Sequence, residues 1–112
     1  MSTGDSEVDR SLELLVNAIK QTDVFQNYQA AQQKVAEQPD LQKQIDDFRM
    51  KNYEMQQQYE GYELLEKSDE FTKQYAAFRE NQVVDEFLSA ELAFCRFMQN
   101  MDDILLNELN FH

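Results

Sequence analysis

Very few residues in this chain can interrupt a helix, and that scarcity constrains the fold more than any other feature. The 112 residues include only two glycines, Gly4 and Gly61, and one proline, Pro39. Gln, Glu, Leu, Ala and Met, which are good helix formers, supply much of the rest. We therefore predict an all-α protein, an antiparallel bundle or hairpin of long amphipathic helices. The length suits a single domain with one core.

Short polar side chains and the proline divide the chain into predicted helices. Asp5 or Ser6 can cap a first helix, Thr22 can cap a second, and Pro39 suits the first turn of a third. The alternative at Thr22 is that the first helix continues with only a kink. Asn81 marks a break or a kink before the last helix. The predicted organisation is a frayed N-terminus over 1–5 and one domain over 6–112, with helices over 6–21, 22–37, 39–60, 68–80 and 83–109.

Two stretches resemble each other and help to place the helix starts. TDVFQNYQAAQQK (22–34) and SDEFTKQYAAFRE (68–80) share four identities when one is laid over the other. Each begins with a hydroxyl residue suited to an N-cap, followed by an Asp that complements the helix dipole. Gly61 is predicted to end the preceding helix in the left-handed conformation. Residues 62–67 would then connect it to a new helix at Ser68.

The middle of the chain carries a regular apolar seam. Its spacings alternate between four and three, as a seam between packed helices requires. The members are Leu41, Ile45, Phe48, Asn52, Met55, Tyr59 and Tyr62. Asn52 is the one clearly polar member, and we interpret it as tilted to the rim of the seam.

The last predicted helix has an apolar face wider than packing against one helix needs. One stripe comprises Val83, Phe87, Ala90, Phe94, Phe97, Met101 and Ile104; its neighbour comprises Val84, Leu88, Glu91, Cys95, Met98, Asp102, Leu105 and Leu109. Either a central place in a bundle or a face shared between subunits would cover both stripes. Aromatic residues and Met are favoured at interfaces. We predict self-association, a dimer first, through a surface formed by Phe87, Phe94, Phe97, Met98, Met101 and Leu105.

The charge restricts the kinds of partner. The formal net charge is −12, and the ten basic residues are scattered. Such a surface repels phosphate, so we predict no direct binding to nucleic acid or to anionic lipid. The N-terminus has no apolar run typical of a signal peptide, and no stretch approaches the length of a membrane span. These features predict a cytoplasmic protein without membrane insertion.

The residues that usually carry catalysis are missing. The single histidine is His112, the last residue, and there is no glycine-rich phosphate loop. We therefore predict no enzymatic activity, no catalytic or metal-ligating residues and no cofactor. A helical bundle that binds a metal, a cluster or a small molecule between subunits is the alternative hypothesis.

Two residues in the face of the last helix have more than one interpretation. Cys95, the single cysteine, is predicted to behave as a small buried hydrophobe rather than as a redox or metal site. Glu91 is either a buried partner for Arg49, Arg79 or Arg96, or a residue at the rim. The rim position is the prediction.

Three segments resemble a known family. They are SLELLVNAIKQTDVFQNYQAAQQKV (11–35), LQKQIDDF (41–48) after the proline, and FRENQVVDEFLSAE (78–91) leading into a long last helix. In order, spacing and residue character they are similar to the YlbF/YmcA family, also called the YheA/YmcA-like proteins. The resemblance covers nearly the whole chain from Ser11.

The resemblance implies a helical assembly, often dimeric or larger, without enzymatic activity. Some members act with related family proteins in competence, sporulation and biofilm development in Gram-positive bacteria. Such complexes are implicated in directing the endoribonuclease RNase Y in mRNA maturation, so an effect on RNA would pass through a partner. Some family complexes hold iron–sulfur clusters on several cysteines. This chain has one, so the resemblance does not extend to a cluster on this chain alone.

Overall fold

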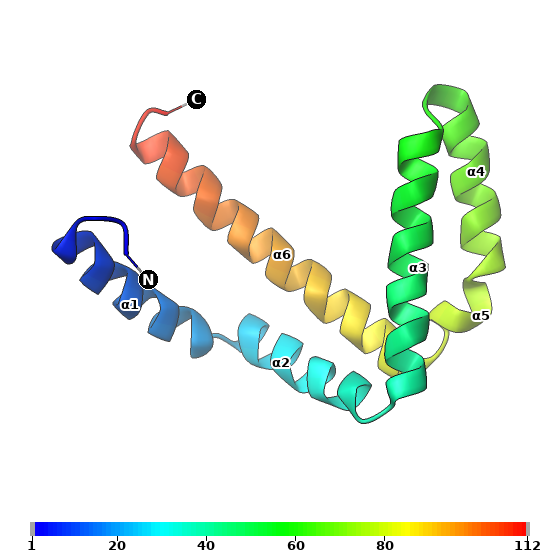
Figure 1. Ribbon diagram of the computed structural model, residues 1–112, viewed down its shortest axis with the longest axis horizontal. Coiled ribbons are helices and arrows are strands. Elements are labelled where there is room, and N and C mark those ends of the chain that lie inside the picture. The colour runs from blue at the N-terminus through cyan, green and yellow to red at the C-terminus, as the bar shows by residue number, and fades with distance from the viewer. Residues whose placement is uncertain (1, 112) are drawn as a thin grey trace. The chain divides into compact units, whose positions relative to one another are not determined.

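The computed structural model describes residues 2–111, which contain six helices and no strand (Figure 1). The helices are α1 (Ser6–Lys20), α2 (Asp23–Ala36), α3 (Pro39–Gln58), α4 (Gly61–Gln74), α5 (Ala76–Arg79) and α6 (Gln82–Glu108). The predicted all-α class is confirmed. The expectation that a second subunit completes the fold stays a prediction.

Side-chain caps form at three of the predicted helix starts. The Asp5 carboxylate accepts hydrogen bonds from two backbone N–H groups in the first turn of α1, at 3.0 and 3.1 Å. The Thr22 hydroxyl accepts from the N–H of Phe25 at 3.2 Å. The Asn81 side chain accepts from the N–H groups of Val83 and Val84 at 2.9 and 3.3 Å. These caps satisfy N–H groups that have no partner within the helix.

The predicted connection over 62–67 and the predicted helix start at Ser68 are wrong. α3 ends at Gln58, and α4 begins at Gly61 and continues through Ser68. Gly61 does adopt the expected positive φ, +62°, but it lies at the start of α4 rather than directly after α3. The segment that follows contains Glu, Leu and Lys and no breaker, so helix propensity prevails once the chain has turned.

Inside α4, Ser68 does not act as a cap. Its backbone carbonyl accepts a hydrogen bond from the Thr72 hydroxyl at 2.9 Å, an internal helix contact. The predicted helix over 68–80 is also divided, because α4 ends at Gln74 and the short α5 follows.

The chain forms two compact units. Unit 1 consists of residues 1–30 and 90–112, and unit 2 of residues 31–89. Both α2 and α6 contribute to each unit. The prediction of a single domain over 6–112 stays a prediction.

Unit 2 contains every residue that is buried in the described part of the chain. These residues are Ala31, Val35, Leu41, Ile45, Val84 and Phe87. They come from α2, α3 and the first turns of α6. The apolar seam is confirmed over Leu41–Met55 of α3 and at Tyr59 just after it, whereas Tyr62 belongs to α4 and is exposed. Asn52 is half-buried, in agreement with a place at the rim.

An aromatic cluster joins α3 to the helices that follow it. α3 and α4 lie side by side and run in opposite directions (Figure 1). The ring of Phe48 lies 5.3 Å from Phe71, 5.1 Å from Tyr75 and 5.4 Å from Phe78, between centroids. Tilted and edge contacts at these distances are favourable for aromatic rings. This hairpin therefore has a specific packing of its own.

A candidate protein-binding surface

Unit 1 differs because none of its described residues is buried, although it is rich in large apolar side chains. We call the exposed members the unit 1 apolar surface. They are Val8, Leu14, Leu15 and Val16 of α1, Leu92, Ile104, Leu105 and Leu106 of α6, and Leu109 and Phe111 beyond it. Monomeric soluble proteins seldom leave large contiguous apolar areas uncovered, and such areas commonly mark interaction sites.

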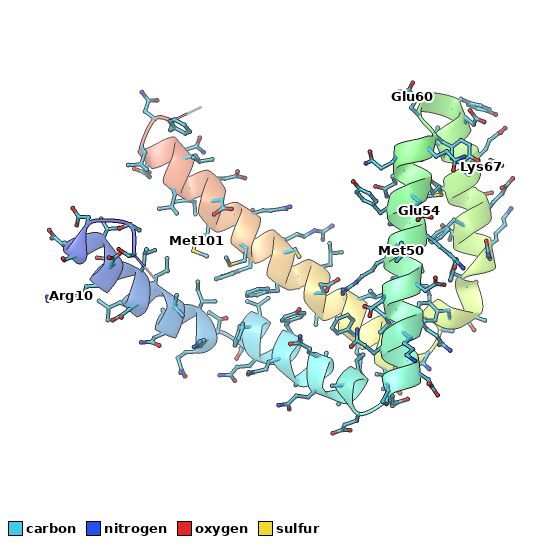
Figure 2. The ribbon with its side chains drawn as sticks, in the orientation of Figure 1. Arg10, Met50, Glu54, Glu60, Lys67 and Met101 are labelled. Carbon is cyan, nitrogen blue, oxygen red and sulfur yellow. The ribbon has the colours of Figure 1, made fainter. Side chains whose placement is uncertain are left out.

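A hollow of about 490 Å³ lies between the start of α1 and the end of α6. We call it the α1–α6 groove. It is lined by Asp5, Glu7, Val8, Ser11, Leu12, Leu15 and Leu105. Figure 2 shows Met101 on the side of α6 that faces α1, and Arg10 on the outer side of α1. Most of the lining of the groove is therefore apolar, and it also includes the carboxylates of Asp5 and Glu7.

The sequence of α1 explains why an apolar wall forms here. The Asp5 cap fixes where the helix begins. Val8, Leu12 and Leu15 then follow at spacings of four and three, which places them on one face. Residues on that face line the groove together with Ser11, whereas Arg10 lies on the outer side of the helix (Figure 2).

Aromatic contacts hold α6 against α2 at the other end of unit 1. The Phe94 ring lies 5.6 Å from Phe25 and 5.4 Å from Tyr28, to which it is nearly parallel. Phe97 stacks 6.5 Å from Phe94. All four rings are half-buried. Unit 1 is thus held together at its aromatic end and open at its α1–α6 groove.

Comparison with known proteins assigns the family. The sequence profile described as "Control of competence regulator ComK, YlbF/YmcA" matches residues 8–110. The chain belongs to the YlbF/YmcA family. This membership makes it part of a regulatory family and agrees with the resemblance carried by the three sequence segments. The match includes α1 from Val8 onward and all of α6, and therefore the apolar residues of both walls of the groove but not Asp5 or Glu7.

Two relatives of this YlbF/YmcA chain are named UPF0342 protein. The one from Caldicellulosiruptor bescii is 27% identical over 99 residues, which cover 87% of this chain and 83% of the relative. The one from Caldicellulosiruptor saccharolyticus is 26% identical over 93 residues, which cover 81% and 78%. No solved structure matches significantly.

The six residues predicted to form the contact surface of this family member fall into three groups. Phe87 is only 4% exposed and belongs to the core of unit 2, where the Arg49 guanidinium lies 5.2 Å above its ring. It is therefore not available on the surface of the chain. Leu105, half exposed, lines the groove. The others are half-buried on α6: Phe94, Phe97, Met98 and Met101.

The α1 wall of the groove was not among the predicted contact residues. Val8, Leu12, Leu15 and Ile19 follow at spacings of four, three and four, which is the pattern of one apolar helix face. The first and last helices carry more apolar surface than a single small domain can bury. This excess could have indicated that the face of α1 is also exposed.

Cys95 is exposed, so the prediction of a buried hydrophobe is wrong. Its stripe on α6 begins at the buried Val84 but is exposed at Cys95 and again from Asp102 onward. Glu91, on the same stripe, is half-buried, as a rim position requires.

Within residues 2–111, no three His, Cys, Asp or Glu side chains come together as a set that could hold a metal ion. His112, the one histidine, lies outside the described residues. No helix in the described part of the chain is long and apolar enough to cross a membrane.

Proposed function

We propose that this protein is a non-enzymatic cytoplasmic regulator that works by helix-mediated association with other proteins and with copies of itself. The observation that carries the proposal is the unit 1 apolar surface, which nothing in the described chain covers. Membership of a regulatory family supports the same class of function.

The energetics favour a protein partner. Full burial of one Leu or Ile side chain contributes about 1.5–3 kcal/mol, so a half-exposed one can gain about half of that. Several such side chains must be covered together, because association itself costs roughly 4–15 kcal/mol. The ten exposed apolar side chains of unit 1 can supply a gain of the same order as that cost, so a partner must cover most of them.

Family membership and net charge indicate which kinds of partner to expect. Related family proteins are the first candidates. A complex that modulates RNase Y-dependent mRNA processing, with effects on competence, sporulation and biofilm formation, is the finer proposal. At a net charge of −12, the RNA in such a complex would be held by another subunit.

Co-purification from native cells, with light scattering of the purified chain, tests the proposal. Ile104→Glu changes a side chain that is 62% exposed in unit 1, so the fold should survive while association is lost. The matched control is Leu65→Glu in α4, where the leucine is 68% exposed. Circular dichroism verifies that both variants are helical.

We expect the wild type and Leu65→Glu to retain their partners and their oligomeric state, and Ile104→Glu to lose them. A wild-type chain that is monomeric at tens of micromolar and recovers no protein from the cell would contradict the proposal. Equal behaviour of the two variants would show that unit 1 is not the contact surface.

A further inference from the structure

We propose that the α1–α6 groove binds an amphipathic helix of a partner protein whose polar flanks are basic. This inference rests on the proposed function, because it takes association through unit 1 as given. It adds the chemistry of the partner, which neither the family nor the relatives specify.

The shape of the groove suits the apolar side of a helix. Val8, Leu12 and Leu15 form a line along α1, and Leu105 of α6 faces the same hollow. An incoming helix with apolar residues at i, i+3, i+4 and i+7 presents a matching ridge. The volume of about 490 Å³ accommodates several side chains but not a whole helix, so the backbone of the partner would remain at the rim.

The rim of the groove is acidic. Asp5 and Glu7 line it on the α1 side. On the α6 side, Asp102 and Glu108 each lie three residues from Leu105, on neighbouring positions of the helix surface, and both are exposed. Two carboxylates therefore belong to the lining of the groove, and two more lie beside Leu105 on the surface of α6.

Basic residues are scarce around the groove. No Lys or Arg follows Arg96 in the sequence. In the first two turns of α1 the basic residue is Arg10, which points to the outer side of that helix (Figure 2). The rim therefore attracts positive charge, and basic flanks on a partner helix would speed and orient its docking.

The same charge argues against a second copy of this chain within the groove itself, so the self-association proposed above would use exposed residues of unit 1 outside the groove, such as Ile104. Residues 1–30 and 90–112 contain nine acidic and three basic side chains. A symmetric dimer through the groove would bring two acidic rims together, because a twofold interface pairs the same patch with itself. Like charges across an interface disfavour the pairing. A basic helix covers the same apolar lining without that repulsion.

Two designed peptides test the proposal by fluorescence polarisation with the full chain. Both have about 18 residues, roughly five turns of helix, with leucines at helix spacing. One carries lysines on its polar flanks, and the other carries glutamates at the same positions. We expect the lysine peptide to bind at least about tenfold more tightly, and its affinity to fall as salt is added.

Paired variants separate the groove from general attraction by an acidic protein. In the first double variant, Asp102→Lys is combined with Glu108→Lys. This variant should lose most of its preference for the lysine peptide over the glutamate peptide. The control variant combines Glu54→Lys with Glu66→Lys, which makes the same change in net charge at exposed positions of unit 2. Glu54 is marked in Figure 2. This control should keep the preference for the lysine peptide. Leu105→Ser should weaken binding of the lysine peptide, and Leu65→Ser should not.

Three results would overturn the proposal: equal binding of the two peptides, an equal response of the two double-lysine variants, or a dimer of the wild type that Leu105→Ser dissociates. If the Ile104→Glu experiment succeeds while the lysine peptide fails to bind, the proposed function stands and the basic-helix inference falls. If the chain also recovers no partner from the cell and remains a monomer, both the proposed function and the basic-helix inference are wrong.

Discussion

Units 1 and 2 are of similar length and come from the same kinds of helix, yet only unit 2 buries side chains completely. Unit 2 has the six buried residues and the cluster around Phe48. Unit 1 has half-buried rings and many exposed leucines. The contrast shows that unit 2 supplies the buried core of the described chain, whereas unit 1 leaves its large apolar side chains uncovered, as the proposed association requires.

The largest expected difference between the units is the loss of unfolding free energy when an apolar side chain is truncated to alanine. Ile45→Ala, at a fully buried position of unit 2, should destabilise the chain by about 2–5 kcal/mol through lost burial and an unfilled cavity. Leu14→Ala, at a position 66% exposed in unit 1, should change stability by no more than about 0.5 kcal/mol. Urea unfolding followed by circular dichroism measures both. Equal costs would remove the distinction between the units.

The aromatic cluster gives the next largest effect. Phe48→Ala should cost about 2–4 kcal/mol, because the Phe48 ring contacts three others in unit 2. Tyr53→Ala, on the same helix but exposed, is the matched control and should cost little. If the two variants unfold at the same urea concentration, the cluster does not stabilise the hairpin.

The two similar stretches provide a smaller but sharper comparison. Thr22→Ala removes the hydroxyl that caps α2 and should cost about 1 kcal/mol. Ser68→Ala, at the aligned position inside α4, should be neutral or stabilising by a few tenths of a kcal/mol, because Ala is the better helix former there. Thermal unfolding of the two variants measures the difference. Equal losses would mean that Ser68 caps a helix after all.

The smallest effect concerns Glu86 of unit 2. A hydrogen bond from the Gln82 amide, and then the nearby Lys34 ammonium, hold the pKa of Glu86 below its usual value. Because the pKa is depressed in the folded state, the stabilisation is present above the usual pKa and is lost as pH falls through the folded value. Wild type should therefore be slightly more stable than Glu86→Gln at pH 7.

Urea unfolding in strong acid is the control for Glu86, because there the two proteins should become equal. The effect is small since both partners are exposed. A difference that persists unchanged at low pH would assign it to the amide substitution rather than to the charge.

Local chemistry made much of the fold predictable from the sequence. The lack of breakers predicted helices, and Asp5, Thr22, Pro39 and Asn81 predicted where four of them begin. The same local reasoning failed at Ser68, because a hydroxyl residue followed by Asp signals a cap only where the preceding residues leave the helix.

The candidate surface was less predictable, since it depends on which apolar residues find cover. Phe87 and Phe94 occupy the same stripe of α6, yet one is buried and the other is half-buried. Periodicity assigns both to an apolar face but does not say what packs on it. Cys95 was misplaced for the same reason, and the α1 wall of the groove emerged only from the tertiary arrangement.

The exposure of Cys95 has a practical consequence. The chain contains one thiol, and it lies at the middle of α6 among the residues of unit 1. A maleimide dye or a nitroxide would therefore attach at a single position of the natural sequence, without any engineered cysteine. The label would report on the environment of α6 in real time, so that the arrival of a partner becomes an optical or magnetic signal.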